Sequence, residues 1–186
     1  MKIPEHIYET AQNGLYRFAV DSPGELKKIA LNAPHAEVYI RVQVSNHGSV
    51  VPLSSKFGAH PSMVLDLAEL AVDLGLTPIG LAFHVGSQAE TIQLWDHAFE
   101  VIGPLYAEAK NRGLNFSILN IVGGFHTYYA ARVPQIEQIA DSIKINLKKH
   151  SLENVALWVE PGRYLVAEAG VLASTIIGRE SRGNHE

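Results

Sequence analysis

The sequence contains no cysteine among its 186 residues. This absence excludes disulfides and thiolate metal sites, and it leads us to expect a cytoplasmic protein. No stretch approaches the roughly 18 consecutive apolar residues of a membrane-spanning helix, and the first residues lack the apolar segment of a signal peptide. The net charge of -4 provides no basic excess, so we expect neither nucleic acid nor a membrane surface as a partner.

The nine histidines do not have the spacing of metal ligands. Neither H-x-x-x-H nor H-E-x-x-H occurs among them, so we expect no dedicated metal site. Hydrophobic residues make up 47% of the chain, which is the usual share in a soluble globular protein. The length is that of a single domain.

Short apolar runs alternate with amphipathic segments along the chain. Strands are predicted at 15–20, 37–44, 78–85, 116–122 and 155–160. Helices are predicted between them from apolar residues three and four positions apart, the first capped by Ser22 and Glu25 around Pro23 and the third bent at Pro104. The apolar positions of the four helices are Leu26, Ile29 and Ala30; Leu67, Leu70, Ala71 and Leu74; Trp95, Ala98, Phe99, Ile102, Leu105, Tyr106 and Ala109; and Ile136, Ile139, Ala140, Ile143 and Leu147. This alternation predicts an α/β fold with a parallel sheet covered by helices.

Each of four predicted strands carries a polar side chain at or near its carboxyl end. These side chains are Arg41, His84, Asn120 and Glu160. Side chains alternate between the two faces of a strand, so each of these residues opposes the apolar face that packs on the helices. In a (β/α) barrel, active sites form at the carboxyl ends of the strands. The sequence therefore predicts a site at this edge of the sheet.

The run Glu160-Pro161-Gly162-Arg163 is the most informative stretch. A carboxylate and a guanidinium at the end of a buried strand are costly to hold in place. That cost is offset if a ligand needs both groups, one for a cationic ring nitrogen and the other for a phosphate. Similar endings occur at His84-Val85-Gly86-Ser87 and at 120–124.

Taken together, these segments resemble a known family, the pyridoxal-phosphate-dependent decarboxylases of basic amino acids, which have an alanine-racemase-like barrel. The resemblance is closest to the ornithine decarboxylases and covers nearly the whole chain. No single segment is specific, but their order and spacing together are. The residues that carry the resemblance are 18–22 with Glu25 and Leu26, Arg41, 53–58, 83–88, 119–125 and 160–164.

The resemblance implies pyridoxal 5'-phosphate as cofactor and a basic amino acid as substrate. It gives catalytic roles to His84, which stacks on the pyridine ring, and to Glu160, which faces the ring nitrogen. A carboxylate there keeps the nitrogen protonated, which favours decarboxylation, whereas racemases of this barrel type place an arginine at that position. The cofactor-binding positions implied are Arg41, His84, Ser87, Gly123, Gly124, Glu160, Pro161, Gly162 and Arg163. The Lys56-Phe57-Gly58 loop matches a segment near the dimer contact of the family.

The sequence also departs from the family pattern. The family attaches its cofactor to a Schiff-base lysine in the first barrel strand, and no lysine here has that context. We therefore expect an incomplete TIM-type barrel with about five of eight strands, inactive alone and lacking the C-terminal β domain. In this division residues 1–170 form a partial pyridoxal-phosphate-binding barrel domain. Residues 171–186 begin with a strand over 171–177 that leads toward the missing domain.

A second departure lies in the phosphate turn, where the family usually reads G-G-G-F-P. Here Val122 replaces the first glycine and His126 replaces the proline. Valine is bulky and strained in a left-handed conformation, so we expect weakened phosphate binding.

Alternative interpretations stay open at this point. His84 and Arg41 each have a purely structural alternative, and Glu160 has one as an ion-pair partner of Arg163. The leading function is the barrel portion of an ornithine decarboxylase in polyamine synthesis, with diaminopimelate, lysine or arginine as other substrates. The chain is alternatively a non-catalytic homologue that binds a full-length decarboxylase, or a degenerate fragment without function. A homodimer, or pairing with a full-length relative, fits these alternatives.

Overall fold

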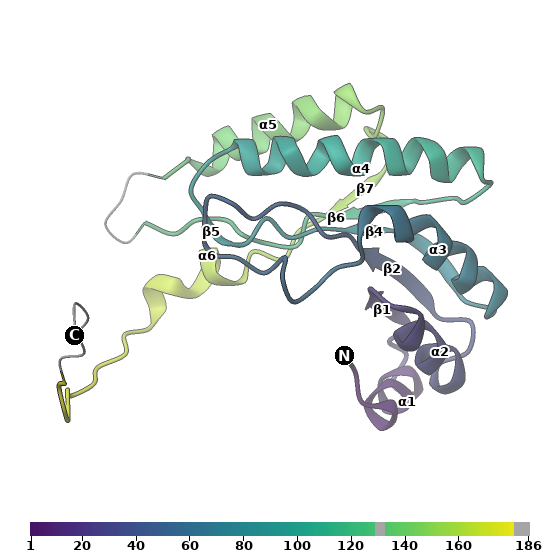
Figure 1. The fold of residues 1–186 in the computed structure, drawn as a ribbon, viewed down its shortest axis with the longest axis horizontal. Coiled ribbons are helices and arrows are strands. Elements are labelled where there is room, and N and C mark those ends of the chain that lie inside the picture. The colour runs from purple at the N-terminus through teal and green to yellow at the C-terminus, as the bar shows by residue number, and fades with distance from the viewer. Residues whose placement is uncertain (129–132, 181–186) are drawn as a thin grey trace.

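The main sheet has five parallel strands in the order β1-β2-β4-β6-β7 (Figure 1). The structure, a computed structural model, describes residues 1–128 and 133–180. The strands are β1 (Arg17–Val20), β2 (Glu37–Arg41), β4 (Thr77–Ala82), β6 (Ile118–Asn120) and β7 (Ala156–Trp158). All five lie within the predicted runs or begin one residue before them, which confirms the parallel α/β fold expected from the sequence.

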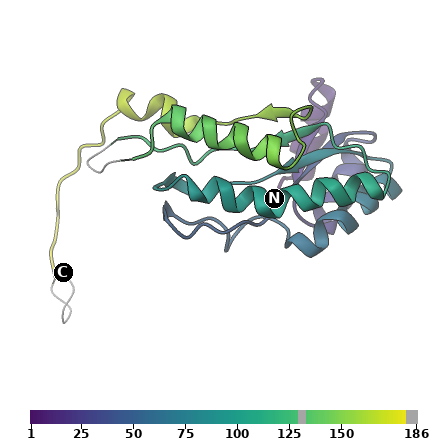
Figure 2. The ribbon, with the colours of Figure 1, turned by 90° about the horizontal axis from the view of Figure 1, so that it is seen from above.

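Helices α2 to α5 alternate with the strands of the main sheet and pack on it, whereas α1 precedes the first strand and packs on α2 (Figures 1 and 2). They are α1 (Pro4–Gln12), α2 (Pro23–Asn32), α3 (Val64–Asp73), α4 (Gln93–Asn111), α5 (Ile136–Lys149) and α6 (Gly162–Val166), with short 3-10 turns η1 (Pro61–Met63) and η2 (Ala167–Ala169). The four predicted helices are α2 to α5. The Ser22 hydroxyl accepts from the Glu25 amide at 3.4 Å, so α2 begins at the predicted cap. Helix α4 runs continuously past Pro104.

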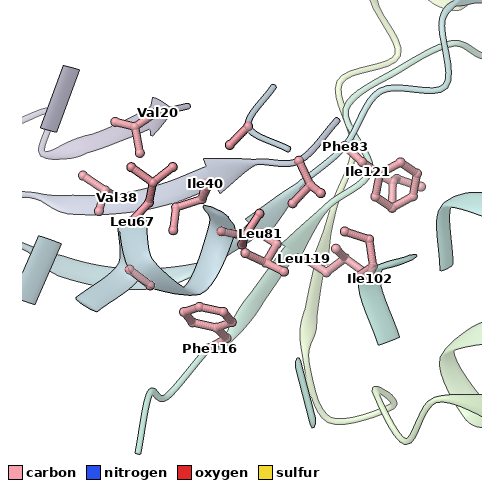
Figure 3. Packing of buried hydrophobic residues seen from close by; sticks show 14 of the residues in the cluster. Val20, Val38, Ile40, Leu67, Leu81, Phe83, Ile102, Phe116, Leu119 and Ile121 are labelled. Atoms are coloured by element: carbon pink, nitrogen blue, oxygen red, sulfur yellow. The ribbon is translucent and has the colours of Figure 1, made fainter. Parts of the chain in front are cut away.

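The core lies between the sheet and the helices (Figure 3). Ile40, Leu81 and Leu119 on neighbouring strands are completely buried, and Leu67 of α3 and Ile102 of α4 pack on the same face. Each such side chain contributes about 1.5–3 kcal/mol by leaving water. The apolar face predicted from strand alternation is therefore the face that packs on the helices, and the polar groups lie on the opposite face.

A second, two-stranded sheet was not predicted. Strands β3 (Ser49–Val51) and β5 (Ser87–Ala89) pair antiparallel, with Ser49 opposite Ala89 and Val51 opposite Ser87. Gly86 makes this possible because it has a φ of 94° directly before β5. A side chain at Gly86 would meet the Ser49 hydroxyl at 2.1 Å, so the two segments approach closely only at a glycine. The pair holds the loop after β2 against the chain that leaves β4.

The described structure has no strand over 171–177, where the sequence predicts one, and the predicted division of the chain at residue 171 stays a prediction. These residues have neither helix nor strand, and Val171, Leu172 and Ile177 are at least 93% exposed. A strand forms only when its backbone pairs with a neighbour, and in the described part of the chain no strand lies alongside this segment. The rest of the predicted 171–186 unit, residues 181–186, lies outside the described residues. Among the described residues, no helix combines the length and apolar character needed to cross a membrane.

Candidate functional site

The carboxyl ends of β6 and β7 are joined by a contact between two side chains. The Asn120 amide nitrogen donates to Glu160 Oε1 at 2.6 Å, and Asn120 Oδ1 accepts from the Val122 amide at 2.8 Å. Asn120 is buried, whereas Glu160 is solvent-exposed. Asn120 therefore fixes the orientation of the Glu160 carboxylate and also shapes the turn that follows β6.

His84 lies beyond the end of β4, with its imidazole near the same turn. Its Nδ1 accepts from the Gly86 amide at 3.0 Å, which leaves the proton of the neutral ring on Nε2. Burial and, second to it, the charge of Arg41 lower the pKa of His84 to about 4, although the Glu160 carboxylate partly opposes them. The ring is therefore neutral at neutral pH.

Arg41 at the end of β2 completes the charged part of the site. Its guanidinium carbon lies 5.0 Å from the ring centre of Phe57, in cation–π geometry. Burial lowers the pKa of Arg41, and the carboxylates of Asp21 and Glu160 oppose that effect. Arg41, His84 and Glu160 are therefore close enough to influence one another electrostatically.

Two glycines after β6 form a cradle with no room for side chains. A Cβ at Gly123 would lie 2.9 Å from the Glu160 carbonyl oxygen and 3.6 Å from His84 Nε2. Gly124 has a φ of 101°, and a Cβ there would lie 2.6 Å from the Gly86 carbonyl oxygen. Both close approaches depend on glycine, so this turn fits tightly between the two neighbouring segments.

Val122 precedes this cradle in a left-handed conformation, with a φ of 48°. Its carbonyl accepts from the Glu160 amide, so the strained residue is tied to β7. A β-branched residue with this φ is an outlier that costs of order 1–3 kcal/mol. A glycine would adopt this left-handed geometry without strain, so position 122 has a glycine-like backbone with a valine side chain.

The other predicted positions lie around this cluster. Ser87 is in β5, Pro161 caps α6, and Gly162 begins α6 with its amide donating to the Glu160 carbonyl at 2.9 Å. Arg163 lies in the same short helix and is exposed, and its carbonyl accepts from the Thr127 hydroxyl at 3.5 Å. The structure therefore brings Arg41, His84 and Glu160 together with Gly123. The side-chain roles of Ser87 and Arg163 stay predictions.

Sequence reasoning did not assign two residues that support the site. The buried Asn46 donates to the His84 carbonyl at 2.9 Å and accepts from the amides of Leu53 and Ser54 at 2.7 and 2.8 Å. Tyr39 lies near Glu160, and burial together with that carboxylate raises the pKa of its hydroxyl. Neither has a sequence signal, because the site residues that they act on, His84 and Glu160, are distant along the chain.

The sequence of this chain is similar to those of known proteins. Residues 1–167 match the family described as "Pyridoxal-dependent decarboxylase, pyridoxal binding domain". The chain is 36% identical over 174 residues to the lysine/ornithine decarboxylase of Selenomonas ruminantium, covering 93% of this chain and 44% of that protein. It is 31% identical over 172 residues to antizyme inhibitor 2 of Xenopus laevis, covering 91% and 38%.

A solved structure shows the same fold. The crystal structure of SrLDC in complex with PLP and cadaverine superposes with a TM-score of 0.79 at 32% identity, covering 89% of this chain and 41% of that one. The chain thus spans less than half the length of each protein that it is compared with here.

Proposed function

This chain belongs to the family of pyridoxal-dependent decarboxylases, and we propose that it is the cofactor-binding barrel portion of a decarboxylase of a basic amino acid. Pyridoxal 5'-phosphate is the proposed cofactor, and ornithine is the preferred substrate. Two comparisons support this substrate class, one with a sequence named a lysine/ornithine decarboxylase and one with a structure solved with cadaverine. The cytoplasmic location expected from the lack of cysteine stays a prediction.

The residues of the site fit this cofactor. A neutral, half-buried imidazole at His84 can lie against an aromatic ring without a charge penalty. The Glu160 carboxylate, held by Asn120, can face a protonated ring nitrogen, and the backbone amides of Gly123 and Gly124 are proposed as phosphate ligands. Arg163, at the start of α6, is proposed as a further phosphate ligand.

When bound, pyridoxal phosphate supplies an electron sink for loss of carbon dioxide. The contribution of the chain is electrostatic and positional. Glu160 would hold the ring-nitrogen proton, because a carboxylate beside a cationic nitrogen favours the protonated form. The neutral His84 would cover one face of the ring, and Arg41 would balance the negative charge of Glu160.

The observation that carries this proposal is the contact of Asn120 with Glu160 beside the glycine cradle and His84. Gly123 lies close to both the Glu160 backbone carbonyl and the His84 imidazole, so the turn brings its backbone amides beside the two proposed catalytic residues. Together these features match the needs of a flat ligand with a cationic nitrogen at one end and an anion at the other.

We further propose that the 186-residue chain is inactive alone. Lys2 binds the Ala19 carbonyl and Glu25, Lys28 pairs with Glu25, and Lys56 lies in the loop before Gly58. The remaining lysines are on helices, at positions 27, 110, 144, 148 and 149. None extends from a sheet strand of the described structure.

A titration tests cofactor binding. Pyridoxal phosphate is added to the purified chain while the fluorescence of Trp158, which is two residues before Glu160, is followed in a Trp95→Phe background. We expect quenching that Glu160→Gln weakens and that Glu153→Gln, at an exposed glutamate, does not change. Absence of saturable quenching in the parent would sink the cofactor proposal.

An activity assay tests the proposal that the chain is inactive alone. We expect no release of carbon dioxide from ornithine or lysine by the chain alone. Carbon dioxide release, or a borohydride-reducible absorbance band attached to one lysine, would overturn it.

A non-catalytic binding role is the second candidate. Strands β1 and β7 each have one neighbour in the main sheet, and Leu157 and Val159 are 38% and 49% exposed beside the β7 edge. One relative is named an inhibitor and not a decarboxylase. Co-purification with a full-length ornithine decarboxylase would support this role, and a strictly monomeric chain without a partner would count against it.

A further inference from the structure

We propose that Gln88 and Thr127 form a buried latch that positions the Gly123–Gly124 turn for the phosphate of the cofactor. Both are positioning residues, because they lie beside the turn and act on it through hydrogen bonds. The inference rests on the proposed function for its ligand, while the latch itself is a property of the chain.

Two hydrogen bonds join the residues in a ring. The Thr127 amide donates to Gln88 Oε1 at 2.9 Å, and the Gln88 amide nitrogen donates to the Thr127 carbonyl at 3.1 Å. The Gln88 side chain thus pairs with the backbone of Thr127 as a neighbouring strand would. His126 Nδ1 also lies 2.7 Å from the Thr127 carbonyl oxygen.

This pairing is buried and therefore costly to lose. Gln88 is 5% exposed, Thr127 is 6% exposed and His126 is 8% exposed. A buried amide left without partners is costly, so Gln88 has a strong preference for the state in which both bonds form. Gln88 also has a φ of 57°, an uncommon left-handed conformation for a non-glycine residue. The backbone at Gln88 is thus held in a less favoured state in which the side chain reaches Thr127.

The latch connects three segments of the site. The Ala89 amide donates to the Gly124 carbonyl at 2.9 Å, so β5 contacts the turn directly beside the latch. The Thr127 hydroxyl donates to the Arg163 carbonyl at 3.5 Å, which extends the connection to α6. The segment after His84, the glycine turn and the helix after Glu160 are therefore joined through Thr127.

Such a connection has a direct consequence for anion binding. Glycines lose more conformational freedom on ordering than other residues, so a turn with Gly123 and Gly124 is costly to fix. A latch that orders the turn before the ligand arrives removes that cost from the binding step. The benefit should be confined to the part of the ligand that contacts the turn, which is the phosphate.

The test uses the full chain and two variants. Gln88→Leu removes both bonds to Thr127 at similar volume, and Thr127→Val removes only the hydroxyl bond to Arg163. Asn146→Leu is the matched control, because Asn146 is also an amide that is 5% exposed, and its nitrogen donates to Asp96 between α4 and α5, away from the turn.

Two readouts separate positioning from general destabilisation. In hydrogen exchange without cofactor, Gln88→Leu should speed exchange of the Thr127 and Ala89 amides by about tenfold more than Asn146→Leu does. In titrations, Gln88→Leu should weaken binding of pyridoxal phosphate by about tenfold and leave binding of pyridoxal, which lacks the phosphate, unchanged. Thr127→Val should give a smaller shift of the same kind.

Either of two results would overturn the latch. One is unchanged exchange at Thr127 in Gln88→Leu, and the other is an equal loss of affinity for pyridoxal and its phosphate. If the parent chain binds neither compound, the cofactor proposal fails, and the exchange data alone then decide whether the latch orders the turn.

Discussion

Asn120 on β6 and Glu160 after β7 are joined by a hydrogen bond of 2.6 Å between an amide nitrogen and a carboxylate oxygen. The two residues are forty positions apart in the sequence and meet because their strands are parallel neighbours that end at the same edge. Asn120 uses its amide oxygen to accept from the Val122 amide. One buried side chain therefore fixes both the carboxylate and the start of the glycine turn.

Replacing Asn120 by alanine should lower the free energy of unfolding by about 1–2 kcal/mol, because the Val122 amide loses its acceptor and Glu160 loses its donor. Urea denaturation measures the change. Asn115→Ala, at an exposed asparagine, is the control and should have little effect. Equal stabilities of the two variants would show that the Asn120 contacts contribute nothing.

Replacing Val122 by glycine should raise the free energy of unfolding by about 1 kcal/mol, because glycine adopts a φ of 48° without the clash of a β-branched side chain. The same change should tighten pyridoxal phosphate binding by opening the turn. Thermal unfolding and a cofactor titration measure the two effects. Val122→Ala, which keeps a Cβ at this φ, should fall between parent and glycine variant. Unchanged or weaker cofactor binding in Val122→Gly would contradict the expectation.

The low pKa of His84 predicts acid sensitivity. The unfolded imidazole titrates near 6.5 and the folded one near 4, so between these values the unfolded state binds more protons. Stability should therefore fall as the pH drops from 6.5 to 4, with no contribution from His84 above that window. His84→Gln should flatten this part of the curve measured by urea unfolding, whereas His97→Gln, at an exposed histidine, should preserve its slope.

Arg41 and Glu160 should move the pKa of His84 in opposite directions. The Arg41 charge disfavours the imidazolium, so Arg41→Met should raise the pKa. The Glu160 charge favours the imidazolium, so Glu160→Gln should lower it. NMR titration of the imidazole protons measures both shifts. Arg112→Met, which removes an exposed ion pair with Glu108, serves as the control. Shifts of the same sign would show that the three groups do not form one cluster.

Adding a methyl group to Gly124 should lower the stability of the fold strongly. Its Cβ would lie 2.6 Å from the Gly86 carbonyl oxygen at a φ of 101°, and we expect Gly124→Ala to cost more than about 2 kcal/mol. Gly162 provides a matched contrast, because a Cβ there would meet no atom within 4 Å at the start of α6. Gly162→Ala should be neutral or slightly stabilising in the same denaturation experiment.

The parts of the fold that periodic patterns encode were predictable from the sequence. Helices α4 and α5 follow from apolar residues on one face, and the polar ends of β2, β6 and β7 follow from strand alternation. Helix α1 was not predicted, although Pro4 at its start and the buried Ile7 and Ala11 four residues apart are its signal. The predicted strand over 116–122 is reduced to Ile118–Asn120, because the Asn120 side chain and the turn at Val122 end it early.

The supporting contacts of the site could not be predicted. Gln88 and Asn46 act through hydrogen bonds to backbone groups about 40 residues away, and such bonds leave no local pattern. The β3–β5 pair depends on the same long-range approach, made possible by Gly86. Residues 171–177 have a local pattern without a long-range contact. Their apolar sequence suits a strand, but no partner strand lies alongside them among the described residues.

The strand order of the main sheet has a consequence for biosynthesis. Each strand from β2 onward is added on the same side of the strand before it, so no strand has to wait for a later one to fill a gap. A chain that emerges from the ribosome can therefore dock each strand-and-helix unit onto a surface already made. Throughout this order of assembly, the newest unpaired hydrogen-bonding edge is on the strand that formed last, and in the finished sheet that strand is β7.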